Sequence, residues 1–422
     1  MSLALSEHVA TWSIAAAAVL GVITRPRNLP EALWAVLGAA ALVIFSLLSV
    51  SDAVAAILKG TDVYLFLTGM MVLAELARRE GLFDWLAAYA VNHAAGSAKK
   101  LFVLVYGVGT IVTIFLSNDA TAVVLTPAVY AAARRATAPP LPFLFICAFI
   151  ANAASFVLPI SNPANLVVFG HRMPVLLTWL SEFGFASVIS IVSTYGVLLL
   201  TQRRHLAGRV SYQVEQPLLA ASGCIVAGAI AVTAIVLLFA STSGWQLGLP
   251  TFLAGAGAWL LVSAMKRESP WPVLEKVSWT VLPLVAGLFV LVQGIESTGV
   301  LAGLIHSSSA GAQHAPRETA LVAGSLVAFA CNAVNNLPMG LLAGTVAQGA
   351  HLPAQVTGAL LIGVDLGPNL SVTGSLATIL WLVAIRREGE DVSAWKFLAV
   401  GSLVMPLPLI ASLATFIGRA SF

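Results

Sequence analysis

The chain has 422 residues, of which 59% are hydrophobic and 9% are charged, and its mean hydropathy is +0.95. A soluble domain would carry about a quarter charged residues, so the composition excludes an ordinary soluble fold and predicts an all-α polytopic protein surrounded by membrane lipid. The formal net charge of +3 comes from basic clusters beside apolar runs. Such clusters report membrane orientation, so no nucleic acid partner is expected.

Basic residues assign the cytoplasmic ends of the predicted spans. By the positive-inside rule, clusters of Lys and Arg lie on the inner side of the inner (plasma) membrane. These clusters are Arg25/Arg27, Arg78/Arg79, Lys99/Lys100, Arg134/Arg135, Arg203/Arg204/Arg209, Lys266/Arg267/Lys276 and Arg386/Arg387. They predict spans over residues 9–24, 31–49 and 62–77, then an interfacial stretch over 81–95.

Residues 101–133 form the first predicted hairpin. Basic pairs flank both ends, and each half has only about 16 residues, which is short for a full span. The segment therefore enters and leaves on the same side, with "SNDAT" at its tip. Residues 141–182 then cross outward, but "LPISNPAN" (158–165) breaks the helix because prolines cannot continue its interior. Residues 184–202 return.

The polar stretch 205–216 divides the chain into an N-terminal repeat, 1–204, and a C-terminal repeat, 217–422. The second repeat contains a hairpin over 318–349 with "CNAVNNLPMG", and a helix over 355–385 that is broken at "DLGPNLSVTG". Its full spans are predicted over 217–240, 246–264, 278–295 and 394–417. The prediction is about ten spans plus two hairpins, with both termini outside.

The two halves are related by regular offsets in residue number. Gly69 and Gly287 open similar runs at an offset of 218, and the same offset relates Ser117 and Asn118 to Asn335 and Asn336. An offset of 213 places Asn152 opposite Asp365. Because the basic residues put the two hairpins on opposite sides, the pattern predicts an inverted-topology repeat with substrate near the midplane and alternating access.

Polar side chains gather at these two hairpin tips and two helix breaks. An interrupted helix leaves backbone groups unpaired, which is tolerated in a membrane only beside protein or a water-filled cavity. The residues could merely hold the re-entrant segments together, or they could also bind a small solute. The predicted substrate-binding residues are Ser117, Asn118, Thr121, Asn152, Asn162, Asn165, Asn335, Asn336, Asn369, Ser371, Thr373 and Ser375.

Two carboxylates lie among these polar residues. Acidic side chains are costly within a membrane and commonly mark an ion or proton path, so Asp119 and Asp365 are the predicted proton-coupling residues. A carboxylate could alternatively accept N–H bonds at a helix start. Glu75 and Glu296 are weaker candidates, and Glu75 lies one turn from Arg78.

At these motifs the sequence resembles a known family. "FLSNDATAVVLTP", "NAVNNLP" and "IGVDLGPNLSVTGSLATILWL" are similar to signature segments of arsenite efflux permeases of the ArsB type, within an ion transporter superfamily. The resemblance implies export of As(OH)3 and Sb(OH)3, driven by protons alone or with a soluble ATPase subunit docked from the cytoplasm. Departures at Ala120, Thr121 and Asn369 leave the neutral hydroxide open, because related carriers export silicic acid.

The residues themselves agree with a neutral substrate. No Lys or Arg lies within the four breaks, whereas a di- or tricarboxylate needs positive compensation. A sodium/proton antiporter is the alternative, although hard cations favour sites richer in charged oxygen. The affinity of arsenic for thiols offers a rival binding mode through Cys147 and Cys331.

The sequence carries no signature of an enzyme. It has neither a catalytic motif nor a phosphate-binding loop, so the chain is predicted not to be an enzyme and any ATP hydrolysis belongs to another polypeptide. The three cysteines lack zinc-type spacing and the histidines are scattered. No metal and no cofactor are therefore expected.

Overall fold

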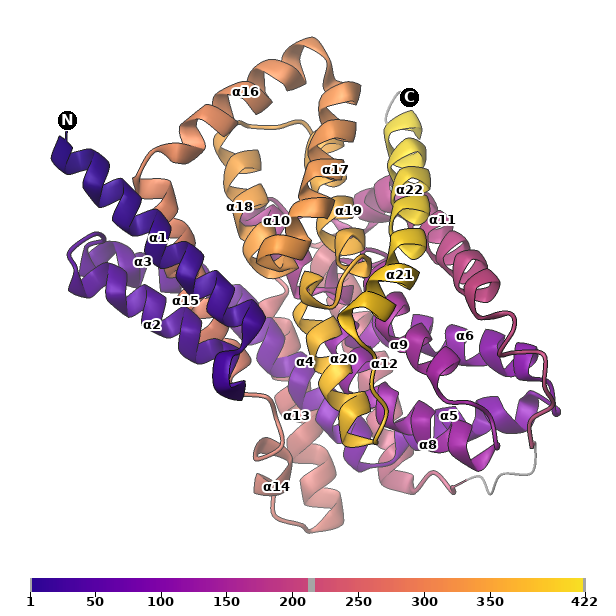
Figure 1. The fold of residues 1–422 in the computed structure, drawn as a ribbon. Helices are drawn as coiled ribbons and strands as arrows, with labels where there is room; N and C mark the ends of the chain where they lie inside the picture. The colour runs from indigo at the N-terminus through magenta and orange to yellow at the C-terminus, as the bar shows by residue number, and fades with distance from the viewer. Residues whose placement is uncertain (1, 212–216, 420–422) are drawn as a thin grey trace.

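The computed structural model describes residues 2–211 and 217–419, and the elements named in these ranges are helices (Figure 1). Apolar composition and the need to pair every backbone group inside a membrane explain this result. The first half contains α1 (Ser2–Thr24), α2 (Glu31–Ile44), α3 (Val50–Lys59), α4 (Thr61–Arg79), α5 (Leu82–His93), α6 (Ala98–Leu116), α7 (Asn118–Ala120), a π-helical turn (Thr121–Leu125), α8 (Thr126–Arg135), α9 (Leu141–Ala153), α10 (Pro163–Phe169) and α11 (Leu176–Gln202).

The second half has a similar order of helices, some of equal length to those of the first half and some not. It contains α12 (Ala221–Thr242), α13 (Gly248–Lys266), α14 (Trp271–Leu274), α15 (Val281–Ser297), α16 (Val300–His314), α17 (Pro316–Val334), α18 (Asn336–Gly349), α19 (Ala354–Leu366), α20 (Leu376–Arg387), α21 (Ala394–Val404) and α22 (Pro406–Arg419). The predicted linker, 205–216, falls partly outside the described residues.

Length and composition identify the membrane helices. Six helices in the described ranges are long and apolar enough to cross a membrane, or up to eight if the bent pairs α3–α4 and α15–α16 each form one span. The prediction of about ten spans also counted broken segments. One boundary prediction was wrong: the broken helix ends at Phe169 and α11 begins at Leu176, because Gly170 (φ 53°) and Pro174 interrupt the chain earlier than 182.

Helix bounds follow the two sequence offsets. The first and last residue numbers of α6 and α17 differ by 218, and those of α9 and α19 differ by 213. The first residues after α6 and α17, Ser117 and Asn335, both have positive φ. The opposite membrane orientation of the two halves stays a prediction.

The two halves pack through glycine-rich helix crossings. Helix α4 of the first half packs on α13 of the second, where a Cβ on Gly69 would lie 2.3 Å from the carbonyl oxygen of Thr251. Helix α15 packs on α2 in the same way, with Gly287 against the backbone of Ala35. Small residues let these backbones approach closely, as is common between membrane helices.

Two of the predicted cytoplasmic clusters, Arg78/Arg79 and Lys266/Arg267, meet at one end of the α4–α13 pair. Ion pairs Arg79–Glu268 (2.7 Å) and Lys266–Glu80 (3.1 Å) join the ends of α4 and α13. At the opposite ends of the same two helices, the Gly248 N–H donates to Asp62 Oδ1 (2.7 Å). Helices α4 and α13 are therefore parallel, with the basic residues at one end only of this pair.

Candidate functional site

A small cavity brings both hairpin tips and the first helix break together. Its volume is about 30 Å³, and its polar lining comes from Asn118 and Asp119 of the first tip, Asn162 of the first break and Asn336 of the second tip. The start of α20 contributes Ala377, and the remaining lining is apolar: Leu67, Pro163, Val281, Val285, Leu337 and Leu376. Segments from the two halves of the chain thus meet at one point.

The two tips share one backbone turn. Ser117 has φ 93° and ψ 162°, and Asn335 has φ 76° and ψ 152°. Each residue ends one helix, and the next residue, Asn118 or Asn336, begins another. The first N–H groups of a helix have no intrahelical partner, and Asn335 Oδ1 accepts one of them, from Leu337 (3.4 Å). The first helical residue after each turn, Asn118 or Asn336, lines the cavity.

The first helix break is held by its own asparagines. Asn165 Nδ2 donates to the carbonyl oxygens of Ser155 (2.9 Å), Leu158 (3.3 Å) and Pro159 (3.3 Å). Asn162 Oδ1 accepts from the N–H of Ala164 (3.0 Å) and so caps α10. These bonds satisfy carbonyls that the missing helical turn leaves open.

The second helix break is stabilised mainly by hydrogen bonds to a residue of the second hairpin. Asn332, in α17, accepts from Ser371 Oγ (2.7 Å) and donates to the carbonyl of Gly367 (3.0 Å). Thr373 Oγ1 donates to the Asn332 carbonyl (3.0 Å). Ser375 caps α20 by accepting from the N–H of Thr378 (3.1 Å). Ser371 and Thr373 therefore contact the second hairpin and do not line the cavity.

Hydrogen bonds also join the two breaks across the molecule. Asn162 Nδ2 donates to Asp365 Oδ1 (2.6 Å), and Asn152 Nδ2 donates to Asn369 Oδ1 (2.9 Å). Asn369 Nδ2 in turn donates to the carbonyl of Phe149 (3.2 Å). The four residues that these side-chain bonds join are buried, with at most 2% of each exposed. Burial makes the loss of any one partner costly.

The two predicted proton-coupling residues occupy different places. Asp119 is half-buried and lines the cavity, and no described side chain or N–H hydrogen-bonds to its carboxylate. Asp365 is 1% exposed and lies behind Asn162, outside the cavity lining. The carboxylate available to a solute in the cavity is Asp119.

The remaining predicted residues lie around this centre. Thr121 shares a hydrogen bond with Thr113 (2.8 Å) beneath the first tip. Cys147 and Cys331 are fully buried and donate to the carbonyls of Phe143 and Val364, outside the cavity lining. Glu75 pairs with Arg78, through Nε at 2.7 Å.

Sequence reasoning missed Asn332 and Thr378 as members of the polar network. Asn332 stands one turn before the second tip, within "CNAVNNLPMG". Its helical spacing from Asn335 and Asn336 is the signal that could have found it.

Membrane-length helices around a small polar cavity at paired re-entrant tips define a multi-pass membrane transporter. The chain belongs to the citrate transporter family (CitMHS), whose model matches residues 18–366. It is accordingly an inner-membrane, multi-pass transporter.

Relatives of known name confirm the resemblance to arsenite permeases. The arsenical pump membrane protein of Escherichia coli (strain K12) is 27% identical over 84% of this chain and 85% of that protein. The protein of the same name from Yersinia enterocolitica is 26% identical, covering 81% of this chain and 82% of the relative. An uncharacterised transporter of Mycobacterium tuberculosis is 25% identical, covering 88% of this chain and 89% of the relative.

A solved structure supports the fold alone. The YdaH transporter of Alcanivorax borkumensis, whose topology is described as unusual, superposes with a TM-score of 0.58 at 17% identity. The match covers 88% of this chain and 87% of the other.

Proposed function

We propose that the protein is a secondary active transporter that exports arsenite and antimonite as neutral As(OH)3 and Sb(OH)3. Export is coupled to inward movement of protons, by alternating access between repeats of opposite orientation. The observation that carries the proposal is the polar lining of the central cavity: three carboxamides and one carboxylate, with no cationic side chain among its lining residues.

The residues that line the cavity favour a neutral hydroxide over citrate, the solute in the family's name. A tricarboxylate desolvated between the tips would need Arg, Lys or comparable positive compensation, and Asp119 would repel it. A trihydroxide carries O–H donors and oxygen acceptors. Asn118 Oδ1 is buried with no hydrogen-bond partner among the described residues, so it can accept from such an O–H group.

Proton coupling follows from the position of Asp119 beside the same cavity. Protonation from the outside removes its charge after the solute has left. Release of that proton to the cytoplasm restores the carboxylate before the next solute binds, so the proton and the solute compete for overlapping positions. Asp365 serves this cycle indirectly by holding Asn162.

A transport assay tests the proposal directly. Everted membrane vesicles with an acidic interior should accumulate arsenite and antimonite, whereas vesicles without the protein should not. Parallel measurements use silicic acid, sodium and citrate. Proton-dependent accumulation of citrate or sodium, without arsenite, would overturn the proposal, and accumulation of silicic acid alone would change the hydroxide while keeping the mechanism.

Transport requires no chemical step, and we propose that the chain is not itself an enzyme. A soluble ATPase subunit could add its own driving force from the cytoplasmic side. Adding ATP to the vesicles, with and without a candidate ATPase, measures this contribution against the proton gradient alone.

A further inference from the structure

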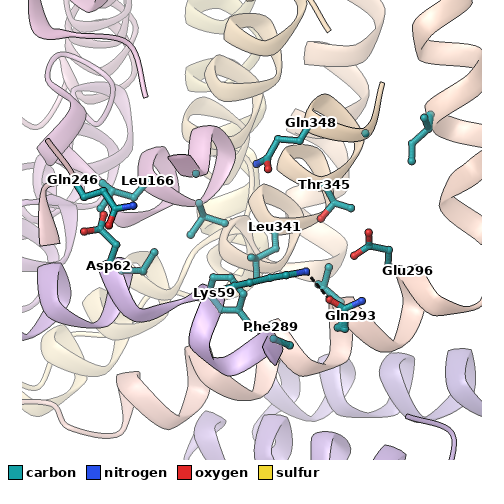
Figure 2. A pocket seen from close by; sticks show the side chains of 17 residues that line it. Lys59, Asp62, Leu166, Gln246, Phe289, Gln293, Glu296, Leu341, Thr345 and Gln348 are labelled. Carbon is teal, nitrogen blue, oxygen red and sulfur yellow. Dashed lines mark hydrogen bonds between the residues drawn. The ribbon is translucent and has the colours of Figure 1, made fainter. Parts of the chain in front are cut away.

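A second, larger polar cleft opens at one end of the helix assembly. Its volume is about 340 Å³, and Figure 2 shows its side chains converging from α3, α4, α10, α15 and α18. The polar lining consists of Lys59, Asp62, Gln246, Gln293, Glu296, Thr345 and Gln348. Lys59 Nζ donates to Gln293 Oε1 (2.8 Å) across the cleft.

Exposure falls from the rim of the cleft to its floor. Lys59, Glu296 and Gln348 at the rim are exposed. The apolar residues beneath them are buried, with exposed fractions of 4% for Val63, 3% for Leu166 and 6% for Leu341. The cleft thus has an exposed polar mouth and a buried apolar floor.

The floor lies directly over the central cavity. Val63 and Leu341 line the cleft, and Leu67 and Leu337, four residues along the same helices, line the cavity. Phe289 and Val285 of α15 repeat this relation. Four residues of helix span about 6 Å, so one layer of apolar side chains separates the two spaces.

The mouth lies at the end of α4 opposite the basic cluster that contains Arg79. Asp62, at the cleft, and Arg79, in the basic cluster, are separated along α4 by about 25 Å of helix. If the clusters are cytoplasmic, as the positive-inside rule predicts, the cleft opens to the outside.

We infer that this cleft is the outer vestibule of the transport path, and that its apolar floor closes the central cavity from the outside in this structure. The inference rests on the proposed function for its direction of flow. Solute leaving the central cavity passes the floor of Val63, Leu166 and Leu341 and is rehydrated among carboxamides and a hydroxyl. Two carboxylates against one ammonium at the mouth disfavour anions and admit a neutral hydroxide.

Labelling from each side of the membrane tests the vestibule. In a Cys224→Ser background, which keeps only the two fully buried cysteines, Thr345→Cys should react with a membrane-impermeant maleimide added to intact cells. Lys99→Cys, in a predicted cytoplasmic cluster, is the matched control and should react only in everted vesicles. Reaction of Thr345→Cys from the cytoplasmic side alone would overturn the inference, as would no reaction of either Thr345→Cys or Gln348→Cys.

A bulky substitution in the cleft, which needs no thiol labelling, tests whether solute passes through it. Thr345→Trp should fill the vestibule and lower export at least tenfold at normal protein level. Leu326→Trp, on a residue 64% exposed on α17, should leave export unchanged. The assay uses whichever solute the unaltered chain accumulates, so failure of the arsenite proposal stays separate. Normal export by Thr345→Trp would show that the cleft lies off the path.

Discussion

The two hairpin tips have the same backbone but different side-chain chemistry. Ser117 and Asn335 turn the chain with closely similar positive φ values, and each is followed by an asparagine in the shared cavity. The next residue is Asp119 in the first tip and Leu337 in the second. The two tips therefore share a backbone geometry, whereas only the first tip carries a carboxylate.

This difference suggests how a symmetric scaffold can couple two solutes. The paired amides, Asn118 and Asn336, face the cavity from both repeats and suit a solute that must be bound from either side. A single carboxylate suits a single proton. Substitutions in the two tips and the two breaks test this division between shared binding and one-sided coupling.

The largest effect is expected from the first tip's carboxylate. Asp119→Asn keeps the shape of the side chain but cannot exchange a proton, so accumulation driven by a pH gradient should fall at least about 100-fold. Downhill exchange of labelled arsenite should persist, because the amide still fits the cavity. Uphill transport at the normal rate would show that Asp119 is not the coupling residue.

The two amides should behave alike. Asn118→Ala or Asn336→Ala removes one polar partner of the solute, a loss of about 1–2 kcal/mol each, or roughly 5- to 30-fold in export. Arsenite resistance of cells and protein amount in membranes are measured together. Full resistance in both variants would contradict the shared binding site. A defect in one variant alone would contradict equivalent roles for Asn118 and Asn336.

Asp365→Asn should have a smaller effect on transport. The new Oδ1 can still accept from Asn162 Nδ2, so α10 stays capped and the cavity keeps its shape. We expect proton-driven accumulation within about threefold of normal. A loss like that expected of Asp119→Asn would move coupling to the second break.

Much of this comparison could be predicted from the sequence. The offsets of 218 and 213 in residue number match the helix bounds, because α6 and α17 have equal lengths, as do α9 and α19. The motif positions of Asn118, Asp119, Asn162 and Asn336 followed from the polar breaks. Their meeting in one cavity is a property of the fold.

Other parts could not be predicted from local sequence. Ser371 and Thr373 look as available as Asn118, yet both hydrogen-bond to Asn332, a contact set by how α17 packs on the second break. The outer cleft joins residues as distant as Lys59 and Gln348. Only the three-dimensional packing of five helices reveals it.

Substitutions in the two helix breaks should lower the stability of the protein by different amounts. Asn165→Ala leaves three carbonyls of the first break without their shared donor, which should lower stability by about 1–3 kcal/mol. Ser371→Ala removes one bond to Asn332 and a longer one to Thr373 (3.1 Å), and should cost about 1 kcal/mol. Thermal unfolding of the purified protein in detergent measures both. Equal losses would show that the first break does not depend on its own asparagine.

The smallest and most symmetric effect is expected at two glycines. Gly81 and Gly299 precede α5 and α16 with φ of 75° and 74°, and a Cβ at either position would meet no atom within 4 Å. The cost of Gly81→Ala and Gly299→Ala is therefore backbone strain alone, about 1 kcal/mol for each. If both variants lower the unfolding temperature equally and leave export unchanged, the result would support two repeats that share the same backbone conformation at this position. A loss of export in one variant only would show that the short helix after that glycine takes part in transport.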